Sequence, residues 1–180
     1  MRERPLRVVI TGSESTGKTT LAEHLAGHHH VYFVPEYVRG YAERKGGHVT
    51  RDDHWPIARG QVAVQDALLD QARRASHPLL LYDTDLLSHV TYCHHYTGGC
   101  DRGIEELAQM RMADHYLLLD IDVPWVPDGI RDRGDRRLEL HMAFIETLQR
   151  FSAPFTLIRG SWDERFTAAV GVINGLLLSP

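Results

Sequence analysis

The sequence predicts a three-layer α/β fold in which a doubly wound, parallel sheet of five strands lies between two layers of helices. Five short, nearly continuous apolar runs are bounded by turn signals, and longer segments of helical character separate them. Continuous rather than alternating hydrophobicity is typical of strands that are covered on both faces. The 180 residues contain no internal repeat and no low-complexity linker. We therefore expect one domain over residues 1–180.

The alternation gives each element its place along the chain. The expected strands are Arg7–Gly12, Val31–Pro35, Pro78–Asp83, His115–Asp120 and Phe155–Gly160. The expected helices are Lys18–Ala26, Tyr37–Lys45, Ile57–Ala75, Leu86–Tyr96, Gly103–Met112, Asp135–Arg150 and Trp162–Leu178. In open α/β sheets ligands bind at the carboxyl ends of the strands, so the residues that follow each strand are the first candidates for a functional site.

Composition narrows the class of protein. The 24 acidic residues outnumber the 20 lysines and arginines, and a net charge of -4 argues against a surface that coats nucleic acid. Two cysteines imply no disulfide framework. The N-terminal stretch MRERPLRVVITG does not resemble a secretion signal, and no run approaches the ~20 apolar residues that span a bilayer. We expect a soluble, cytoplasmic protein without nucleic-acid or membrane partners, and the oligomeric state stays open.

The first expected strand leads into GSESTGKTT, and a helix follows. This stretch matches G-x-x-x-x-G-K-[ST], the pattern of a phosphate-binding P-loop, in the strand–loop–helix context that the pattern requires. The glycines allow the backbone N–H groups to point at phosphate oxygens, and the helix N-terminus adds a favourable dipole. Lys18 is expected to reach the β- and γ-phosphates, Thr19 to complete a Mg²⁺ shell and Thr20 to contact the α-phosphate. We therefore expect ATP and Mg²⁺ at the loop residues Gly12, Ser13, Glu14, Ser15, Thr16, Gly17, Lys18, Thr19 and Thr20.

Two aspartates follow the third strand, in LLLYDTD. A P-loop needs a carboxylate near its metal at the end of a buried strand. We expect Asp83 to hold Mg²⁺ and Asp85 to point at the acceptor substrate. The alternative is that one of them caps the helix beginning near Leu86.

The second strand ends in PEYVR, which brings further polar residues to the same sheet edge. Glu36 is a candidate general base for an attacking hydroxyl, and Tyr37 and Arg39 are candidates for binding the acceptor. The alternative is an exposed helix-start glutamate with an i,i+3 arginine pair of little energetic value. Whether Glu36 or Asp85 takes the proton stays open.

The segment DVPWVPDGIRDRGDRR follows the fourth strand, where P-loop kinases carry a lid. Arginines on such an element can neutralise the transferring phosphoryl group while water is excluded. We expect a lid at about 122–137 with Arg131 in a catalytic role and Arg133 on the phosphates; Arg136 and Arg137 are further candidates. The alternative is a solvated basic helix interspersed with aspartates.

Aromatic, histidine and cysteine residues leave two questions open. Tyr92 and Tyr96, at i and i+4, either line an acceptor pocket or pack in the core. The spacing of the cysteines and histidines in TYCHHYTGGC matches no closed zinc site. His28–His30 are expected to form a solvated connection between a helix and a strand rather than a metal site.

Six stretches carry a resemblance to a known family: GSESTGKTTL, PEYVRGY, DHWPIARGQ, YDTDLLSHVTYCHHY, DVPWVPDGIR and WDERF. In this order they closely resemble the nicotinamide riboside (ribosylnicotinamide) kinase domain of the NadR type, in the P-loop kinase and AAA-like ATPase group, over nearly the whole chain. The resemblance implies ATP-dependent phosphorylation of the 5′-hydroxyl of nicotinamide riboside to nicotinamide mononucleotide, a step of NAD salvage. It also implies that Glu36, Asp83 and Asp85 handle the ribose and the metal, that Trp125 stacks on the pyridinium ring, and that Arg131 belongs to the lid.

One departure from that family limits the expectation. Its best-known members carry a nucleotidyltransferase domain ahead of the kinase, whereas here the P-loop begins at Gly12. Adenylyl transfer and repression are therefore not expected from this chain. Two alternatives remain: a kinase for another nucleoside or small metabolite, and a P-loop ATPase switch acting on a macromolecular partner. Adenine contacts are expected near RGSWDERF, with Arg159 and Arg165 as candidates.

Overall fold

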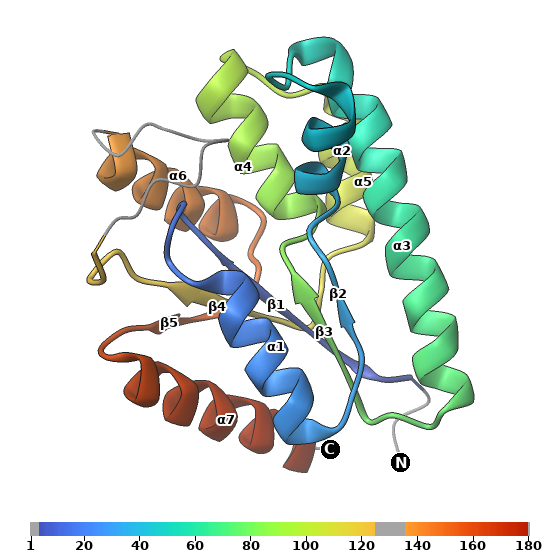
Figure 1. The fold of residues 1–180 in the computed structure, drawn as a ribbon, viewed down its shortest axis with the longest axis vertical. Helices are drawn as coiled ribbons and strands as arrows, with labels where there is room; N and C mark the ends of the chain where they lie inside the picture. The colour runs from blue at the N-terminus through green and yellow to red at the C-terminus, as the bar shows by residue number, and fades with distance from the viewer. Residues whose placement is uncertain (1–3, 125–135, 180) are drawn as a thin grey trace.

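The computed structural model describes residues 4–124 and 136–179 and confirms the predicted α/β architecture. Five parallel strands form one sheet in the order β2-β3-β1-β4-β5 (Figure 1). The strands are β1 (Leu6–Gly12), β2 (Phe33–Val34), β3 (Leu79–Asp83), β4 (His115–Leu119) and β5 (Phe155–Ile158). The α-helices are α1 (Lys18–His29), α2 (Tyr37–Lys45), α3 (His54–Arg74), α4 (Leu86–Thr97), α5 (Arg102–Met110), α6 (Arg137–Arg150) and α7 (Trp162–Leu178).

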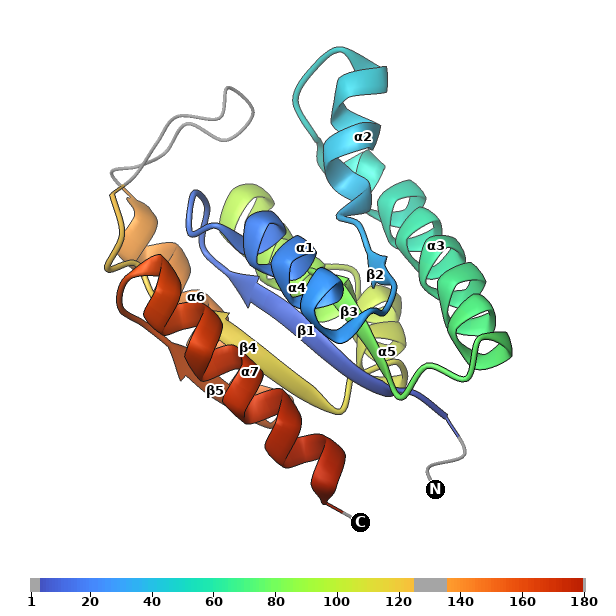
Figure 2. The same ribbon diagram turned by 60° about the horizontal axis from the view of Figure 1, so that its bottom comes forward.

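Both faces of the sheet are buried, which explains the continuous hydrophobicity of the strands. Val8 and Ile10 of β1 pack into one apolar cluster with residues of α1 and α7. Val9 points to the other face, where the cluster is completed by residues of α3, α4, α5 and α6. Figure 2 shows α1 and α7 together on one side of the sheet. The core is therefore two apolar layers separated by the sheet.

The register of the central strands brings the site together. Ile10 of β1 pairs with Asp83 at the end of β3, and Gly12 pairs with Leu119 at the end of β4. The carboxyl ends of the three central strands therefore lie almost level. The segments that follow them meet at one edge of the sheet, as expected for an open parallel sheet.

Strand β2 is shorter than the sequence predicts, and the hydrogen bonds show why. Only Phe33 and Val34 pair with β3. The N–H of Val31 donates instead to the carbonyl oxygen of Ala26, at 3.0 Å, and so takes part in ending α1. Pro35 has no N–H to donate to a ladder. The extended segment therefore contributes two residues to the edge of the sheet.

Helices α1 and α3 are longer than predicted. Helix α1 continues to His29 and ends at His30, whose φ is +52°. Helix α3 begins at His54 because a single 3₁₀ turn at Arg51–Asp53, started by a capping box between Thr50 and Asp53, leads directly into it. Of the helices within 4–124 and 136–179, none combines the length and apolar character needed to cross a membrane.

Candidate nucleotide and acceptor site

The P-loop follows β1 and depends on two glycines. Gly12 has φ of +136° and Gly17 has φ of +82°, values that side-chain-bearing residues rarely adopt. A Cβ atom on Gly12 would lie 2.9 Å from the carbonyl oxygen of Leu119. A Cβ atom on Gly17 would lie 2.3 Å from Cζ3 of Trp162. Both conformation and close packing therefore require glycine at these positions.

The side chains of the loop are arranged around the carbonyl oxygen of Ser13. The Lys18 ammonium group donates to this oxygen at 2.8 Å, and the Thr16 hydroxyl donates to it at the same distance. Lys18 is only 8% exposed, so its charge is held within the concave loop. Backbone N–H groups, a helix N-terminus and a buried ammonium form the arrangement that binds the phosphates of a nucleoside triphosphate.

Asp83 lies where a metal ligand of the P-loop is needed. Its Oδ2 atom accepts a hydrogen bond from the Thr19 hydroxyl at 2.5 Å. Its Oδ1 atom is buried and has no hydrogen-bond partner in the part of the chain that the structure describes. Burial raises the pKa of the Asp83 carboxyl and the nearby Glu36 charge raises it further, while Thr19, Lys18 and Arg39 oppose both. The hydroxyl and carboxylate oxygens of Thr19 and Asp83 are the ligand types that Mg²⁺ prefers, so this pair fits the ion.

Asp85 is the N-cap of α4, as the alternative interpretation of the sequence had it. Its Oδ1 atom accepts hydrogen bonds from the backbone N–H of Ser88 at 3.0 Å and from the Ser88 hydroxyl at 3.1 Å. Its Oδ2 atom accepts one from the Tyr116 hydroxyl at 2.7 Å. Burial raises the pKa of the Asp85 carboxyl, and these hydrogen bonds oppose the rise. Thr84 has φ of +63°, a rare conformation for a β-branched residue, and it separates the two aspartates.

Glu36 occupies the start of α2 at the same edge of the sheet. Its side chain is 5% exposed, and its Oε2 atom lies 3.7 Å from Nε of Arg39, whose side chain is 45% exposed. Glu36 is therefore not the exposed helix-start glutamate of the alternative interpretation, because its side chain is buried. The neighbouring Tyr37 packs its ring against Gly60 of α3, where an added Cβ atom would lie 2.1 Å from Cζ of that ring. Helices α2 and α3 are thereby held in close contact beside Glu36.

A small recess that is open to solvent lies beside these carboxylates. Residues from α2, α3, α4 and the β3–α4 turn line it: Glu36, Val38, Ile57, Gln61, Thr84, Asp85, His89 and Tyr92. Three of the predicted substrate residues, Glu36, Asp85 and Tyr92, are among them. Sequence reasoning missed Gln61 and His89. Gln61 could have been found, because it ends DHWPIARGQ, one of the six stretches that carry the family resemblance.

The two predicted tyrosines connect α4 to the P-loop. The Tyr92 hydroxyl donates to the carbonyl oxygen of Gly12 at 3.3 Å, and the Tyr96 hydroxyl donates to the Glu14 carboxylate. Their rings stack with centroids 6.2 Å apart, and the Tyr92 ring also meets Phe144 edge to face. Tyr92 therefore lines the recess and belongs to the core, whereas Tyr96 positions Glu14.

Arg165 is a structural residue rather than a surface contact for adenine. It is 1% exposed and donates at 2.9 Å to each of the carbonyl oxygens of Thr16, Gly160 and Asp120. It also forms an ion pair with Asp122. A single guanidinium group therefore joins the P-loop, the end of β4 and the β5–α7 loop.

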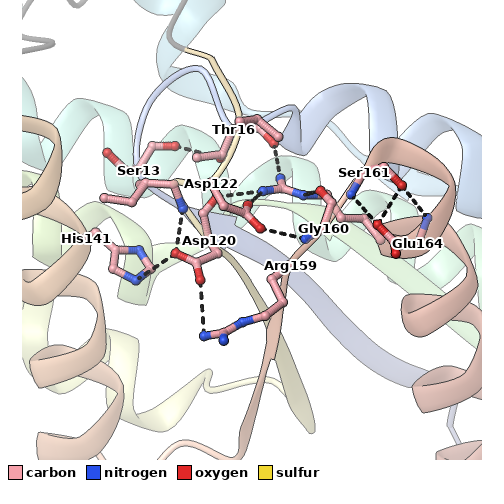
Figure 3. A network of polar contacts seen from close by, with 12 residues as sticks. Ser13, Thr16, Asp120, Asp122, His141, Arg159, Gly160, Ser161 and Glu164 are labelled. Atoms are coloured by element: carbon pink, nitrogen blue, oxygen red, sulfur yellow. Dashed lines mark hydrogen bonds and ion pairs between the residues drawn. The ribbon is translucent and has the colours of Figure 1, made fainter.

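The ends of β4 and β5 carry a wider polar network around this arginine (Figure 3). The Asp120 carboxylate lies 3.2 Å from Nη2 of Arg159 and 3.7 Å from Nε2 of His141. Ser161 and Glu164 form the capping box that begins α7. Burial lowers the pKa of His141, and the Asp120 charge opposes this shift. The sequence analysis did not identify this network.

The expected lid lies largely outside the described residues. Trp125, Arg131 and Arg133 fall within 125–135, so their roles stay predictions. Arg137 is described: its Nη1 donates to the carbonyl oxygen of Val123 at 2.7 Å, and its Nη2 donates to that of Ser15 at 3.4 Å. The base of the segment is therefore joined to the P-loop. Within the described chain no group of three or more histidine, cysteine or acidic residues is arranged to hold a metal.

Comparison with known proteins agrees with this geometry. Residues 7–165 match the family described as AAA domain. The chain is 28% identical over 177 residues to the trifunctional NAD biosynthesis/regulator protein NadR of Escherichia coli K12, and 27% identical to that of Salmonella typhimurium LT2. Each alignment covers 94% of this chain and 42% of the relative, so the chain spans less than half the length of these curated relatives.

Solved structures show the same fold. A crystal structure of NadR protein in complex with NR superposes with a TM-score of 0.79 at 20% identity, covering 98% of this chain and 52% of the other. NadR protein in complex with NAD and AMP-PNP gives 0.78 at 20% identity, with 98% and 50% covered. Thymidylate kinase from Ehrlichia chaffeensis gives 0.68 at 15% identity, with 95% and 99% covered. Together with the P-loop from Gly12 to Thr19, the family match over residues 7–165 shows that the chain belongs to the AAA-domain family of P-loop proteins.

Proposed function

We propose that residues 1–180 act as one ATP-dependent kinase domain that phosphorylates the 5′-hydroxyl of nicotinamide riboside to give nicotinamide mononucleotide. The observation that carries the proposal is the position of Glu36. This buried carboxylate lines a recess and lies close enough to Asp83 to raise the pKa of that metal-site candidate. The candidate base, the recess and the P-loop therefore adjoin one another, which supports the proposal because phosphoryl transfer to a small alcohol requires such an arrangement. The similarity to NadR proteins supports the choice of acceptor.

In the proposed reaction the 5′-oxygen of the acceptor forms a bond to the γ-phosphorus of ATP. The bond between that phosphorus and the β,γ-bridging oxygen breaks, and ADP leaves. The acceptor proton passes to the Glu36 carboxylate, which Arg39 helps to orient at 3.7 Å. The Lys18 ammonium group binds the β- and γ-phosphate oxygens. Mg²⁺ held by Thr19 and Asp83 would supply charge neutralisation at those oxygens when bound.

Asp85 has a different place in this scheme. The hydrogen bonds from Ser88 and Tyr116 hold its carboxylate in a fixed orientation at the start of α4. We assign Asp85 the role of shaping the recess in which the ribose binds. Glu36 lines the same recess with a side chain that does not cap its helix and that lies beside Arg39, and it is the stronger candidate for the proton acceptor.

A coupled ADP-release assay with a panel of nucleosides tests the proposal. We expect nicotinamide riboside to give the highest kcat/KM among nicotinamide riboside, uridine, thymidine and deoxyadenosine. Lys18→Ala should abolish turnover with every acceptor. A large preference for another nucleoside would contradict the substrate assignment. ATP hydrolysis that nucleosides leave unchanged but a protein or nucleic acid stimulates would support a molecular switch instead.

A further inference from the structure

The carboxamide of Gln61 has a hydrogen bond at its oxygen but none at its nitrogen among the described residues. Gln61 lies on α3 and lines the acceptor recess, with 4% of the residue exposed. Its Oε1 atom accepts a hydrogen bond from the backbone N–H of Tyr37 at 3.0 Å. Its Nε2 atom is buried and has no hydrogen-bond partner among the described residues. Gln61 and Ile57 are the two residues of the stretch DHWPIARGQ that line the recess.

The orientation of this amide follows from its neighbour. The backbone N–H of Tyr37 is a donor only, so the atom facing it must be the carbonyl oxygen of Gln61. The NH₂ group is thereby fixed at the opposite edge of the planar amide, away from Tyr37. A buried amide N–H without an acceptor destabilises a folded protein, and native structures rarely retain one without a reason. A ligand oxygen would remove that destabilisation.

The surroundings of the recess define the chemistry of that oxygen. Val38, Ile57 and the Tyr92 ring supply apolar wall, suited to a flat ring or a sugar face. Two carboxylates, Glu36 and Asp85, line the same recess and disfavour an anionic substituent nearby. The lining therefore favours a neutral oxygen as the partner of the amide N–H.

We infer that Gln61 is a specificity-determining residue that donates a hydrogen bond from Nε2 to a neutral oxygen of the acceptor nucleoside. This inference rests on the proposed kinase function and deepens it. The oxygen belongs either to a carbonyl on the base or to a hydroxyl on the ribose, which are equivalent acceptors for an amide N–H. Because the same carboxamide holds the first N–H of α2, binding at Nε2 also fixes the helix that carries Glu36 at its start.

A cycle of substitutions in both enzyme and substrate tests the inference. The variants are Gln61→Met, which removes the donor at similar size, and Gln61→Glu, which keeps an acceptor for Tyr37 but has no amide donor. Gln65→Met is the matched control, because Gln65 is a buried glutamine one helical turn further along α3 that does not line the recess. The substrates are nicotinamide riboside, the pyridine riboside without the carboxamide, and the 2′- and 3′-deoxy ribosides.

Gln61→Met should lower kcat/KM for nicotinamide riboside by about 10- to 100-fold, mainly through KM, and Gln61→Glu should lower it at least as much. In the unmodified protein, removing the contacted oxygen should cause a loss of the same size. In Gln61→Met, removing that oxygen should cause no further loss, and the analogue that shows this behaviour identifies the oxygen as carbonyl or hydroxyl. Gln65→Met should leave kcat/KM within about twofold of the unmodified protein.

The inference would be overturned if, for every analogue, the loss caused by Gln61→Met multiplied with the loss caused by the missing oxygen. The amide would then act only through the start of α2. Failure of the proposed function has a separate signature. If the unmodified protein phosphorylates another nucleoside and not nicotinamide riboside, the acceptor assignment is wrong. The same cycle, run with the carbonyl-deleted and deoxy analogues of that nucleoside, then decides the role of Gln61.

Discussion

The Thr19 hydroxyl donates to Asp83 Oδ2 at 2.5 Å, although 64 positions separate the two residues in the sequence. The pairing of Ile10 with Asp83 places the end of β3 beside the P-loop, and the first turn of α1 brings Thr19 to it. The second oxygen of Asp83 stays buried without a partner among the described residues. The protein thus maintains a costly buried carboxylate at the point where a divalent ion would neutralise it.

Asp83→Asn should lower kcat by about 10²- to 10³-fold and yet stabilise the ligand-free protein at neutral pH. The folded state raises the pKa of the Asp83 carboxyl, so it binds this proton more tightly than the unfolded chain does. The stability contributed by Asp83 is therefore present below its unfolded pKa of 3.8 and is lost as pH rises through the raised value.

Thermal unfolding as a function of pH measures this effect. The Tm advantage of Asp83→Asn should be small near pH 4 and grow toward pH 7, while added ATP with Mg²⁺ should raise the Tm of the unmodified protein more than that of the variant. Asp70→Asn is the control, since the Asp70 side chain is 60% exposed and pairs with Arg73 at the surface, at 3.6 Å. A Tm difference that does not change with pH would contradict the assignment.

Arg165→Met should destabilise the fold by about 2–5 kcal/mol, because it leaves buried carbonyl oxygens and the Asp122 carboxylate without their donor. The three carbonyl oxygens belong to Thr16, Asp120 and Gly160. Arg159→Met is the matched control: the Arg159 side chain is 67% exposed, and its ion pair with Asp120 is worth about 0–1 kcal/mol. Urea unfolding of both variants gives the comparison. Equal losses in the two variants would show that Arg165 does not hold the loops together.

Gly17→Ala should abolish ATP binding and lower Tm, since the new methyl group would overlap the Trp162 ring and alanine is strained at φ of +82°. Adding Trp162→Ala to Gly17→Ala should restore part of the lost Tm by removing the overlap, but not the part due to backbone strain. Gly27→Ala is the control: it lies in α1 with no atom within 4 Å of the new Cβ, so stability should rise by about 0.5–1 kcal/mol. If the second substitution restores nothing, the contact with Trp162 does not limit Gly17.

The sequence predicts the elements of this molecule better than the contacts between them. Buried strands and the P-loop are local patterns, so β3 and the residues from Gly12 to Thr19 are predictable from neighbouring residues alone. Arg165 meets Thr16 across 149 positions, and no local pattern distinguishes a buried arginine at the start of a helix from an exposed one. Its only local signal is the S-x-x-E capping box at Ser161, which fixes where α7 begins.

The candidate site likewise has features that the sequence predicts and features that depend on tertiary contacts. That Asp83 and Asp85 follow a buried strand is visible in the sequence, but their different roles are not. Thr84, with its positive φ, turns the chain between them. The capping contact of Asp85 with Ser88 is local and is open as an alternative in the sequence, whereas the contact with Tyr116 of β4 is tertiary. Side-chain roles that depend on tertiary contacts therefore lie beyond pattern analysis.

The last prediction separates the two candidate general bases. Glu36→Gln keeps the shape of the side chain but cannot accept a proton, so kcat should fall by about 10²- to 10⁴-fold with little change in Tm. Asp85→Asn keeps an N-cap side chain that can still accept from Ser88, so kcat should stay within about tenfold of the unmodified protein while Tm falls. Measuring both parameters for both variants with the best acceptor decides the matter. A normal kcat in Glu36→Gln combined with a large loss in Asp85→Asn would reverse the assignment, and the Ser88 and Tyr116 contacts would then orient the base itself.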